Sequence, residues 1–131
     1  MSFNINGKEP SIIGKVCKSL YLIQQQEGDV VTDPANVAYF KFEDNWFKLS
    51  FDGDTVFWRE QELPSEPLND NLNCCLVLLN LGELDGVIGL VLEDIEYSSN
   101  DESLMANFKF KSGKTLSFKH NCYDDFTSII C

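Results

Sequence analysis

Hydrophobic and polar residues alternate along much of this chain, most clearly in DNWFKLSFDGDTVFWRE at residues 44–60. A period of two is typical of a strand with one buried face, and the DGD triplet is typical of a hairpin turn. A two-residue turn at Asp52 and Gly53 sets Phe47 opposite Trp58; a four-residue loop shifts the pairing by two and keeps the same residues on each face. The stretch therefore predicts two strands whose inner face carries Phe47, Leu49, Phe51, Val56 and Trp58.

The preceding run, NVAYFKFE at 36–43, alternates in the same way. A tight turn at Asp44 and Asn45 sets Phe42 opposite Phe47 and extends the hairpin to three strands. We therefore expect a three-stranded meander with an aromatic inner face.

Two runs near the C-terminus, LMANFKFK at 104–111 and TLSFKH at 115–120, flank a predicted turn at Ser112 and Gly113. A three-residue loop puts an apolar set on the inner face, namely Ala106, Phe108, Phe110, Leu116 and Phe118. The opposite face is basic and carries Asn107, Lys109, Lys111, Thr115, Ser117 and Lys119.

These regions resemble each other in the same order along the chain. AYFKF at 38–42 matches ANFKF at 106–110, and IIGKV at 12–16 matches VIGLV at 87–91. We therefore predict a mainly β fold, an antiparallel sandwich or flattened barrel built from two similar four-strand units, with at most one or two short helices. We interpret 1–131 as a single domain, with an internal repeat of approximately 12–60 and 87–130 joined by a 61–86 connecting segment.

Three segments fit both strand and helix. Residues 11–28 have Ser11 and Gly28 as possible helix caps, but the matching segment of the second unit is strand-like, so we expect a strand. Residues 72–81 are an apolar element that is either a buried strand or a short helix. Residues 123–130 are equally open, since an aspartate at 124 or 125 fits the cap of a last helical turn.

Charge narrows the choice of partner. Ten basic residues against twenty-one acidic ones give a net charge of −11, and residues 27–102 hold eighteen acids and three bases. A chain this acidic repels nucleic acid and anionic membranes, so a charged partner is expected to be basic; solubility alone also explains such a charge. The longest apolar run is too short to span a bilayer, and MSFNINGKEP lacks a signal-peptide pattern, so we expect a cytoplasmic protein.

Catalytic and metal-binding groups are scarce. His120 is the one histidine, and none of the five cysteines lies in a CxxC or Cys/His metal spacing, so we expect no metal site. His120 and Cys122 indicate a structural pairing at a strand end rather than a base and its nucleophile. The sequence has no phosphate-binding or nucleophile motif. We expect no enzyme activity, no cofactor, and cysteines that are reduced and mostly buried.

Two aromatic residues, Trp46 and Phe57, remain on the outer face of the meander, which should otherwise be hydrated. Either another part of this chain covers them, such as the 63–81 segment or Arg59 stacked on Trp46, or they anchor a partner within an acidic rim. The predicted partner-binding residues are Asp44, Trp46, Asp52, Asp54, Phe57, Glu60 and Glu62. A reserve surface is the basic face with Lys109, Lys111 and Lys119, which protection of a strand edge by lysine also explains.

The run FKFEDNWFKLSFDGDTVFWRE, residues 40–60, on a small, acidic, mostly β chain resembles immunity proteins of bacterial contact-dependent growth inhibition and related polymorphic toxin systems. The resemblance implies that the chain binds one cognate toxin domain, often a basic nuclease, and covers its active site or substrate groove. Carboxylates would take the place of substrate phosphates, and aromatic anchors would slow dissociation.

Two other function classes fit the same residues. A small apolar ligand carrier would use a β-barrel cavity lined by the inner aromatic rings, namely Phe40, Phe42, Phe51, Trp58, Phe108 and Phe118. A non-enzymatic adaptor would bind a different protein. Unpaired strand edges also leave a homodimer open.

Overall fold

The computed structural model describes residues 3–27, 30–61, 63–64, 74–81, 84–124 and 126–130, without the side chains of 34, 36 and 74–79. This part of the chain forms ten strands and no helix, which confirms the predicted mainly β fold. The strands are β1 (Asn4–Asn6), β2 (Cys17–Glu27), β3 (Val30–Phe42), β4 (Asn45–Asp52), β5 (Thr55–Glu60), β6 (Cys74–Asn80), β7 (Leu92–Ser99), β8 (Ser103–Phe110), β9 (Thr115–Asn121) and β10 (Phe126–Ile130).

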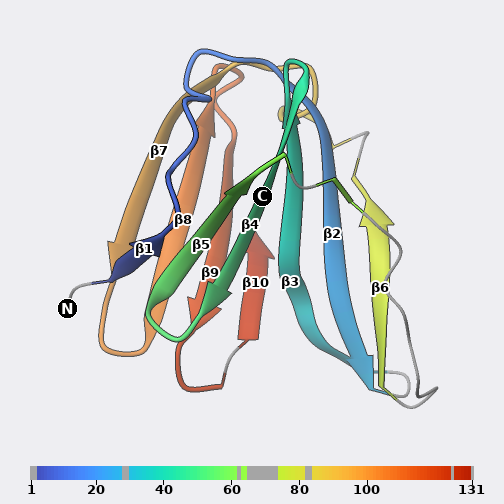
Figure 1. Ribbon diagram of the computed structural model, residues 1–131, viewed down its shortest axis with the longest axis vertical. Coiled ribbons are helices and arrows are strands. Elements are labelled where there is room, and N and C mark those ends of the chain that lie inside the picture. Colours follow the sequence, from blue (N-terminus) through green and yellow to red (C-terminus); the bar gives the residue numbers. More distant parts are fainter. Residues whose placement is uncertain are drawn as a thin grey trace.

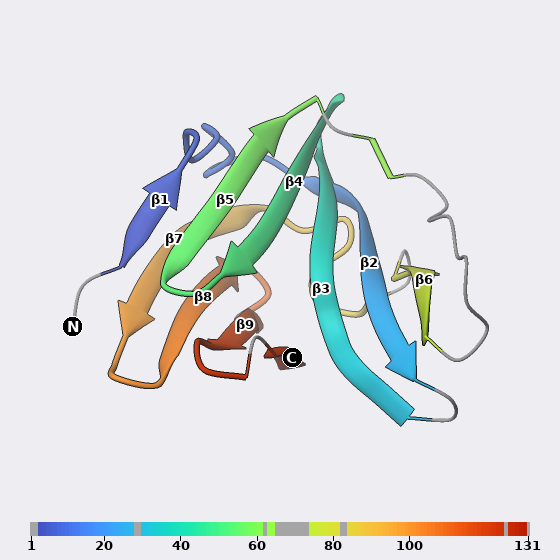
Figure 2. The ribbon, with the colours of Figure 1, turned by 60° about the horizontal axis from the view of Figure 1, so that its bottom comes forward.

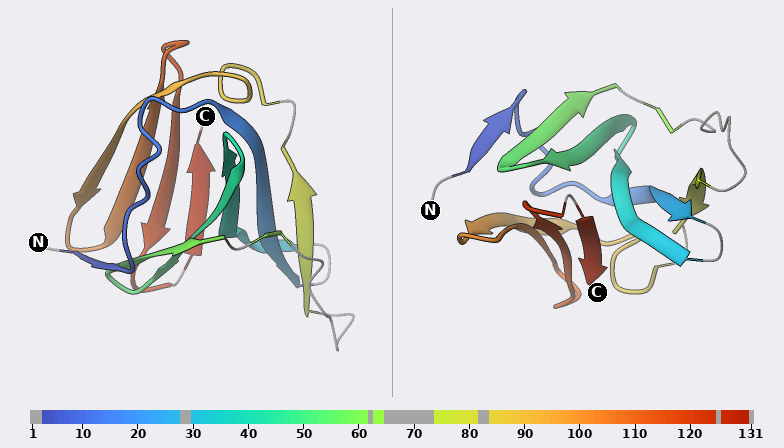
Figure 3. Two further views of the ribbon diagram at one scale, coloured as in Figure 1. Left: turned by 45° about the horizontal axis from the view of Figure 1, so that its top comes forward. Right: turned by 90° about the horizontal axis from the view of Figure 1, so that it is seen from below.

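The strands form two sheets that face each other (Figure 1). The larger sheet has the order β1-β5-β4-β3-β2-β6, and the smaller sheet has the order β10-β9-β8-β7. Paired strands are antiparallel, except that β1 runs parallel to β5. Figure 2 and the right half of Figure 3 show the larger sheet curving around the smaller one, so the fold is a β-sandwich.

Each of the three ambiguous segments contributes a strand, namely β2, β6 and β10, and none contains a described helix. The backbone of β2 pairs with β3 on one side and β6 on the other, and β10 pairs with β9, so sheet partners take the hydrogen bonds that a helix would have made internally. The helical alternative left open for 123–130 is wrong where the structure describes this segment, since 126–130 form β10. Asn121 Oδ1 instead accepts hydrogen bonds from the N–H groups of Tyr123 (3.0 Å) and Asp124 (3.1 Å), which turns the chain back into β10.

Each of the two hairpin turns of the first meander lies one residue away from the two-residue turn that its sequence predicts. Between β3 and β4 the turn residues are Glu43 and Asp44, because Phe42 pairs with Asn45. The expected turn at Asp44 and Asn45 is therefore wrong, and Glu43 adopts a positive φ of 54°. Each register differs from that expectation by two residues, so every side chain keeps its predicted face.

Between β4 and β5 the turn residues are Gly53 and Asp54, and Leu49 pairs with Trp58. The predicted four-residue loop gives the same pairing of Phe51 with Val56, so its register is correct. The alternative turn at Asp52 and Gly53 is wrong. Gly53 has a φ of 57°, so this arrangement gives the position that needs a positive φ to the residue without a Cβ atom. All five residues assigned to the inner face are buried, as predicted.

The C-terminal hairpin has the register predicted from its sequence. Phe108 pairs with Leu116, and the N–H of Phe110 donates to the carbonyl oxygen of Lys114 (3.0 Å), which leaves a three-residue loop. Gly113 in this loop has a φ of 89°. The inner face is buried and the basic face lies on the outside of the smaller sheet.

Aromatic rings from both sheets meet in the core. Phe40 of the larger sheet lies 5.1 Å from Phe108 of the smaller sheet, measured between ring centroids, and Trp58 lies 6.1 Å from Phe108. Phe51 and Phe118 are 6.3 Å apart, and these five rings are at most 8 % exposed. The rings proposed to line a ligand cavity therefore pack against one another in the core.

The first residues of the two predicted units cross each other with equivalent contacts. Val16 forms an isolated antiparallel bridge with Val91. The N–H of Gly14 donates to Leu92 O (2.7 Å), and the N–H of Gly89 donates to Cys17 O (2.7 Å). The two bonds are equivalent, because Gly14 corresponds to Gly89 and Cys17 to Leu92 at a constant offset of 75 residues. The pairing of β2 with β3 and that of β7 with β8 also shift register directly after Cys17 and Leu92. The domain and repeat boundaries themselves stay predictions.

Candidate functional site

The outer face of the larger sheet carries Trp46 and Phe57, both half-buried, as the alternation predicted. Other residues of this face are more buried than expected: Tyr39 is 5 % exposed and Ile23 is 8 % exposed. Tyr39 lies between Tyr21 and Lys48 in adjacent strands, so neighbouring long side chains cover it. The face is thus partly apolar before any partner is considered.

The ring of Trp46 has two neighbours from its own sheet. Tyr21 meets it edge-on with ring centroids 5.9 Å apart, and the Nζ atom of Lys41 lies 6.0 Å from its centroid. An ammonium at this distance lies at the outer limit of a cation–π contact. The remaining surface of Trp46 faces a depression described below.

Phe57 is covered by arginine instead. The guanidinium carbon of Arg59 lies 5.7 Å from the centroid of the Phe57 ring. Arg59 is held there because it donates to the backbone oxygens of Asn6 (3.1 Å) and Trp58 (2.7 Å) and to Asn6 Oδ1 (2.8 Å). The alternative in which Arg59 stacks on Trp46 is wrong, because hydrogen bonds to Asn6 of β1 hold the guanidinium beside Phe57.

The predicted acidic rim is split between the two ends of the meander. Asp44 is exposed and immediately precedes the strand that carries Trp46, and Glu60 lies at the same end because it pairs with Phe47. Asp52 ends β4, and Asp54 lies in the turn that follows it. Both are at the other end of the strand, since the extended chain from Asn45 to Asp52 spans about 23 Å. Glu62 lies outside the described residues.

One end of the meander combines an aromatic ring, an exposed aliphatic side chain and an acid. The Trp46 depression has a volume of about 320 Å³ and is lined by Asp44, Asn45, Trp46, Gln61 and Leu63. Leu63 is 64 % exposed. The N–H of Gln61 donates to Trp46 O (2.7 Å), and its positive φ of 60° turns the chain so that Leu63 lies beside the ring. Alternation alone did not indicate Gln61 or Leu63.

Lysine side chains flank the neighbouring surface. A groove of about 220 Å³ beside the Trp46 depression is lined by Lys8, Ser11, Lys15, Asn45, Phe47, Glu60 and Gln61. Glu60 thus shares this groove with Lys8 and Lys15, whereas Asp44 lines the Trp46 depression and not this groove.

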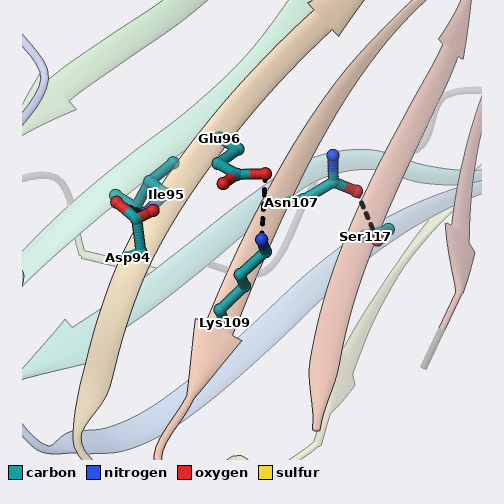
Figure 4. Close-up of polar contacts among 6 residues, drawn as sticks. All are labelled: Asp94, Ile95, Glu96, Asn107, Lys109 and Ser117. Carbon is teal, nitrogen blue, oxygen red and sulfur yellow. Dashed lines mark hydrogen bonds and ion pairs between the residues drawn. The ribbon is translucent and has the colours of Figure 1, made fainter. Parts of the chain in front are cut away.

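The reserve basic surface on the smaller sheet is partly neutralised. Lys109 Nζ lies 3.0 Å from Glu96 Oε2, and Ser117 donates to Asn107 Oδ1 (2.6 Å) in the next row (Figure 4). Lys111 and Lys119 are exposed. This face is hydrated and mixed in charge, which gives an acidic partner little to bind.

A buried hydrogen-bonded chain joins the two sheets. The indole N–H of Trp58 donates to Tyr97 Oη (2.9 Å), and the Tyr97 hydroxyl donates to Glu9 Oε1 (2.7 Å). Burial, and then the hydrogen bond to Glu9, raises the pKa of Tyr97 above its ordinary value. Trp58 is 1 % exposed, so this chain satisfies a polar group inside the core.

His120 lies in the core with Phe51 and Thr127 as neighbours, and its expected pairing with Cys122 stays a prediction. Its ring stacks on Phe51 with centroids 5.7 Å apart, and its Nδ1 lies 2.8 Å from Thr127 Oγ1. The N–H of Thr127 donates to Asp33 Oδ1 (3.0 Å), which ties β10 to the larger sheet. Cys122 follows the end of β9 in a turn and is half-buried.

Cys17 is a buried thiol, and burial raises its pKa to about 12. A thiol with this pKa is almost entirely protonated near neutral pH and is a poor nucleophile. Within the described ranges, no three His, Cys, Asp or Glu side chains gather as metal ligands do. That same part of the chain has no helix of the length and apolarity needed to cross a membrane.

Comparisons with protein-family models, with curated proteins and with solved structures found no match.

Proposed function

We propose that this chain is an immunity protein that binds a cognate toxin domain and covers its active site, with the Trp46 depression at the centre of the contact. The observation that carries the proposal is the combination at this depression of a half-buried tryptophan, an exposed leucine and an exposed aspartate. Tryptophan in a partly enclosed site is the residue type most often responsible for binding energy in protein interfaces.

The charge of the chain supports a basic partner. With a net charge of −11, the protein attracts a cationic surface over long range and orients it before contact. Asp52 and Asp54 lie at the far end of β4 from the depression, and Arg59 covers the intervening Phe57. We therefore assign steering to that end and the lasting contact to Trp46, Leu63 and Asp44.

The test is co-expression with the toxin domain encoded next to this chain, followed by co-purification and growth rescue. The wild type should rescue growth, and Trp46→Ala should weaken binding about thirtyfold, the effect of about 2 kcal/mol at an interface anchor. Phe57→Ala is the matched control, because it also removes an outer-face ring of the same sheet but one covered by Arg59. If the wild type neither binds nor rescues, the immunity function is refuted.

A salt titration separates steering from contact. Reversing Asp52 and Asp54 to lysine should slow association much more at low salt than at high salt, because screening removes long-range attraction. Trp46→Ala should instead speed dissociation at both salt concentrations. An equal effect of the double reversal at both concentrations would remove this turn from the electrostatic contact.

A further inference from the structure

A groove of about 680 Å³ lies where β7 bulges, beside the crossing of the two units. It is lined by Ile13, Gly14, Val91, Leu92, Glu93, Asp94, Lys109 and Lys111, and it shares no residue with the Trp46 depression. Ile13 is an apolar side chain that is 52 % exposed here. Neither the fold nor the proposed function accounts for this groove.

The first unit has a place equivalent to this groove, which its backbone contacts identify. Glu43 N donates to Val16 O (3.1 Å) in the first unit, and Lys111 N donates to Val91 O (3.0 Å) in the second, so Glu43 corresponds to Lys111 and Val16 to Val91. In the first unit the Glu43 side chain folds back, and its Oε1 accepts a hydrogen bond from Val16 N (3.3 Å). A carboxylate thus occupies this place in the first unit.

The second unit has the same backbone donor without the carboxylate. Lysine at position 111 has no acceptor atom, and the described residues provide no other acceptor for the N–H of Val91. Val91 lines the groove and is half-buried. A backbone donor and a lysine ammonium therefore face a site whose counterpart holds an anion.

The other charged side chains that line the groove are Glu93, Asp94 and Lys109. Glu96 pairs with Lys109 (3.0 Å), and Asp94 Oδ1 accepts from the N–H of Ile95 (2.9 Å) along its own strand (Figure 4). Glu93 is exposed. Lys111 is left as the exposed cation of the groove, with Ile13 and Leu92 as its apolar wall.

We propose that this groove binds a small monocarboxylate with an apolar body, whose carboxylate takes the place that Glu43 has in the first unit. The carboxylate accepts the N–H of Val91 and pairs with Lys111, and the apolar body lies on Ile13. A single negative charge is favoured because the chain's net charge of −11 repels multiply charged anions. The inference is independent of the proposed function.

The experiment is a titration of ¹⁵N-labelled protein with hexanoate at constant ionic strength, followed by amide chemical shifts. Hexanoate should shift the Val91 and Lys111 amides saturably, since a new hydrogen bond moves the donor's proton resonance. Hexanol tests whether the apolar body alone binds, and inorganic phosphate tests whether any anion binds. Both should leave the Val91 amide in place, and an equal shift with either one would overturn the proposed ligand class.

Two charge reversals locate the site. Lys111→Glu should weaken hexanoate binding at least about tenfold, because it replaces the pairing cation with a carboxylate that competes for Val91 N. Lys119→Glu makes the same charge change on the same outer face but outside the groove, and should leave binding within about twofold. Equal losses in both variants, or no saturable shift of Val91 in the wild type, would refute the site.

A third variant uses the counterpart. Glu43→Ala removes the carboxylate that accepts from Val16 N, so hexanoate should then also shift the Val16 amide. Lys41 of β3 matches Lys109 and leaves a cation near this opened site. If Val16 stays unchanged while Val91 responds, the correspondence between the two places is wrong and the argument from symmetry fails.

Discussion

Replacing Tyr97 with phenylalanine should destabilise the protein by about 2 kcal/mol without opening a cavity. The change removes one oxygen, which accepts from the Trp58 indole N–H (2.9 Å) and donates to Glu9 (2.7 Å). The ring of Tyr97 and its contact with Phe3, at 5.5 Å between centroids, remain. The loss therefore measures the hydrogen-bonded chain between the sheets.

The magnitude follows from burial at the two ends of this chain. Trp58 is 1 % exposed, so its N–H would lose its acceptor in a dry site, which costs about 1–3 kcal/mol. Glu9 is half-buried, so its carboxylate regains water and adds little to the loss. For a chain of this length, about 2 kcal/mol corresponds to a fall of roughly 7 °C in the melting temperature.

Urea denaturation followed by fluorescence measures this change as a lower midpoint at unchanged slope. Tyr21→Phe is the matched control, because it deletes the same hydroxyl from a half-buried tyrosine on the outer face, and it should cost less than about 0.5 kcal/mol. Glu9→Gln keeps an acceptor for the Tyr97 hydroxyl and should cost less than Tyr97→Phe. A loss below about 0.5 kcal/mol for Tyr97→Phe would refute the reasoning.

Two further predictions concern ionisation. Because the pKa of Tyr97 is raised in the folded protein, the unfolded chain releases this proton first as pH rises, so stability should fall above about pH 10, and the difference between wild type and Tyr97→Phe in urea midpoint should shrink there. An unchanged difference from pH 8 to 11 would contradict this linkage. Cys17, whose pKa is raised to about 12, should resist iodoacetamide at pH 8 until urea unfolds the protein, whereas half-buried Cys122 should react sooner in peptide mass mapping. Labelling of Cys17 at the rate of Cys122 in the native protein would show that β2 opens locally.

The alternation of side chains predicted the faces of the strands, but it did not decide the two hairpin registers of the first meander. A shift of two residues leaves Phe47, Leu49 and Trp58 on the inner face, so the pattern is satisfied by either register. The choice between them depends on backbone conformation at the turns, where Glu43 adopts a positive φ that is unusual for its residue type. The sequence pattern carries no signal for that.

The sequence indicated the faces of Trp46 and Phe57 but not the arrangement of the residues around them. Trp46 and Phe57 are on the outer face, but the acids that are close in sequence lie at opposite ends of β4, since a strand of eight residues separates its two turns. The position of Arg59 depends on β1, whose three residues NIN are too short and too polar to indicate a strand. Leu63 joins the site through the backbone turn at Gln61.

The crossing at Val16 and Val91 places the contact of a symmetric dimer inside one polypeptide. In a two-fold interface every bond occurs twice, as it does here between Gly14 and Leu92 and between Gly89 and Cys17. Each unit therefore carries a self-complementary edge. If the units were separate identical chains, a substitution at this edge would change both sides of the contact at once. Joining the two units in one chain removes that constraint, and the corresponding positions carry opposite charges, glutamate at 43 and lysine at 111.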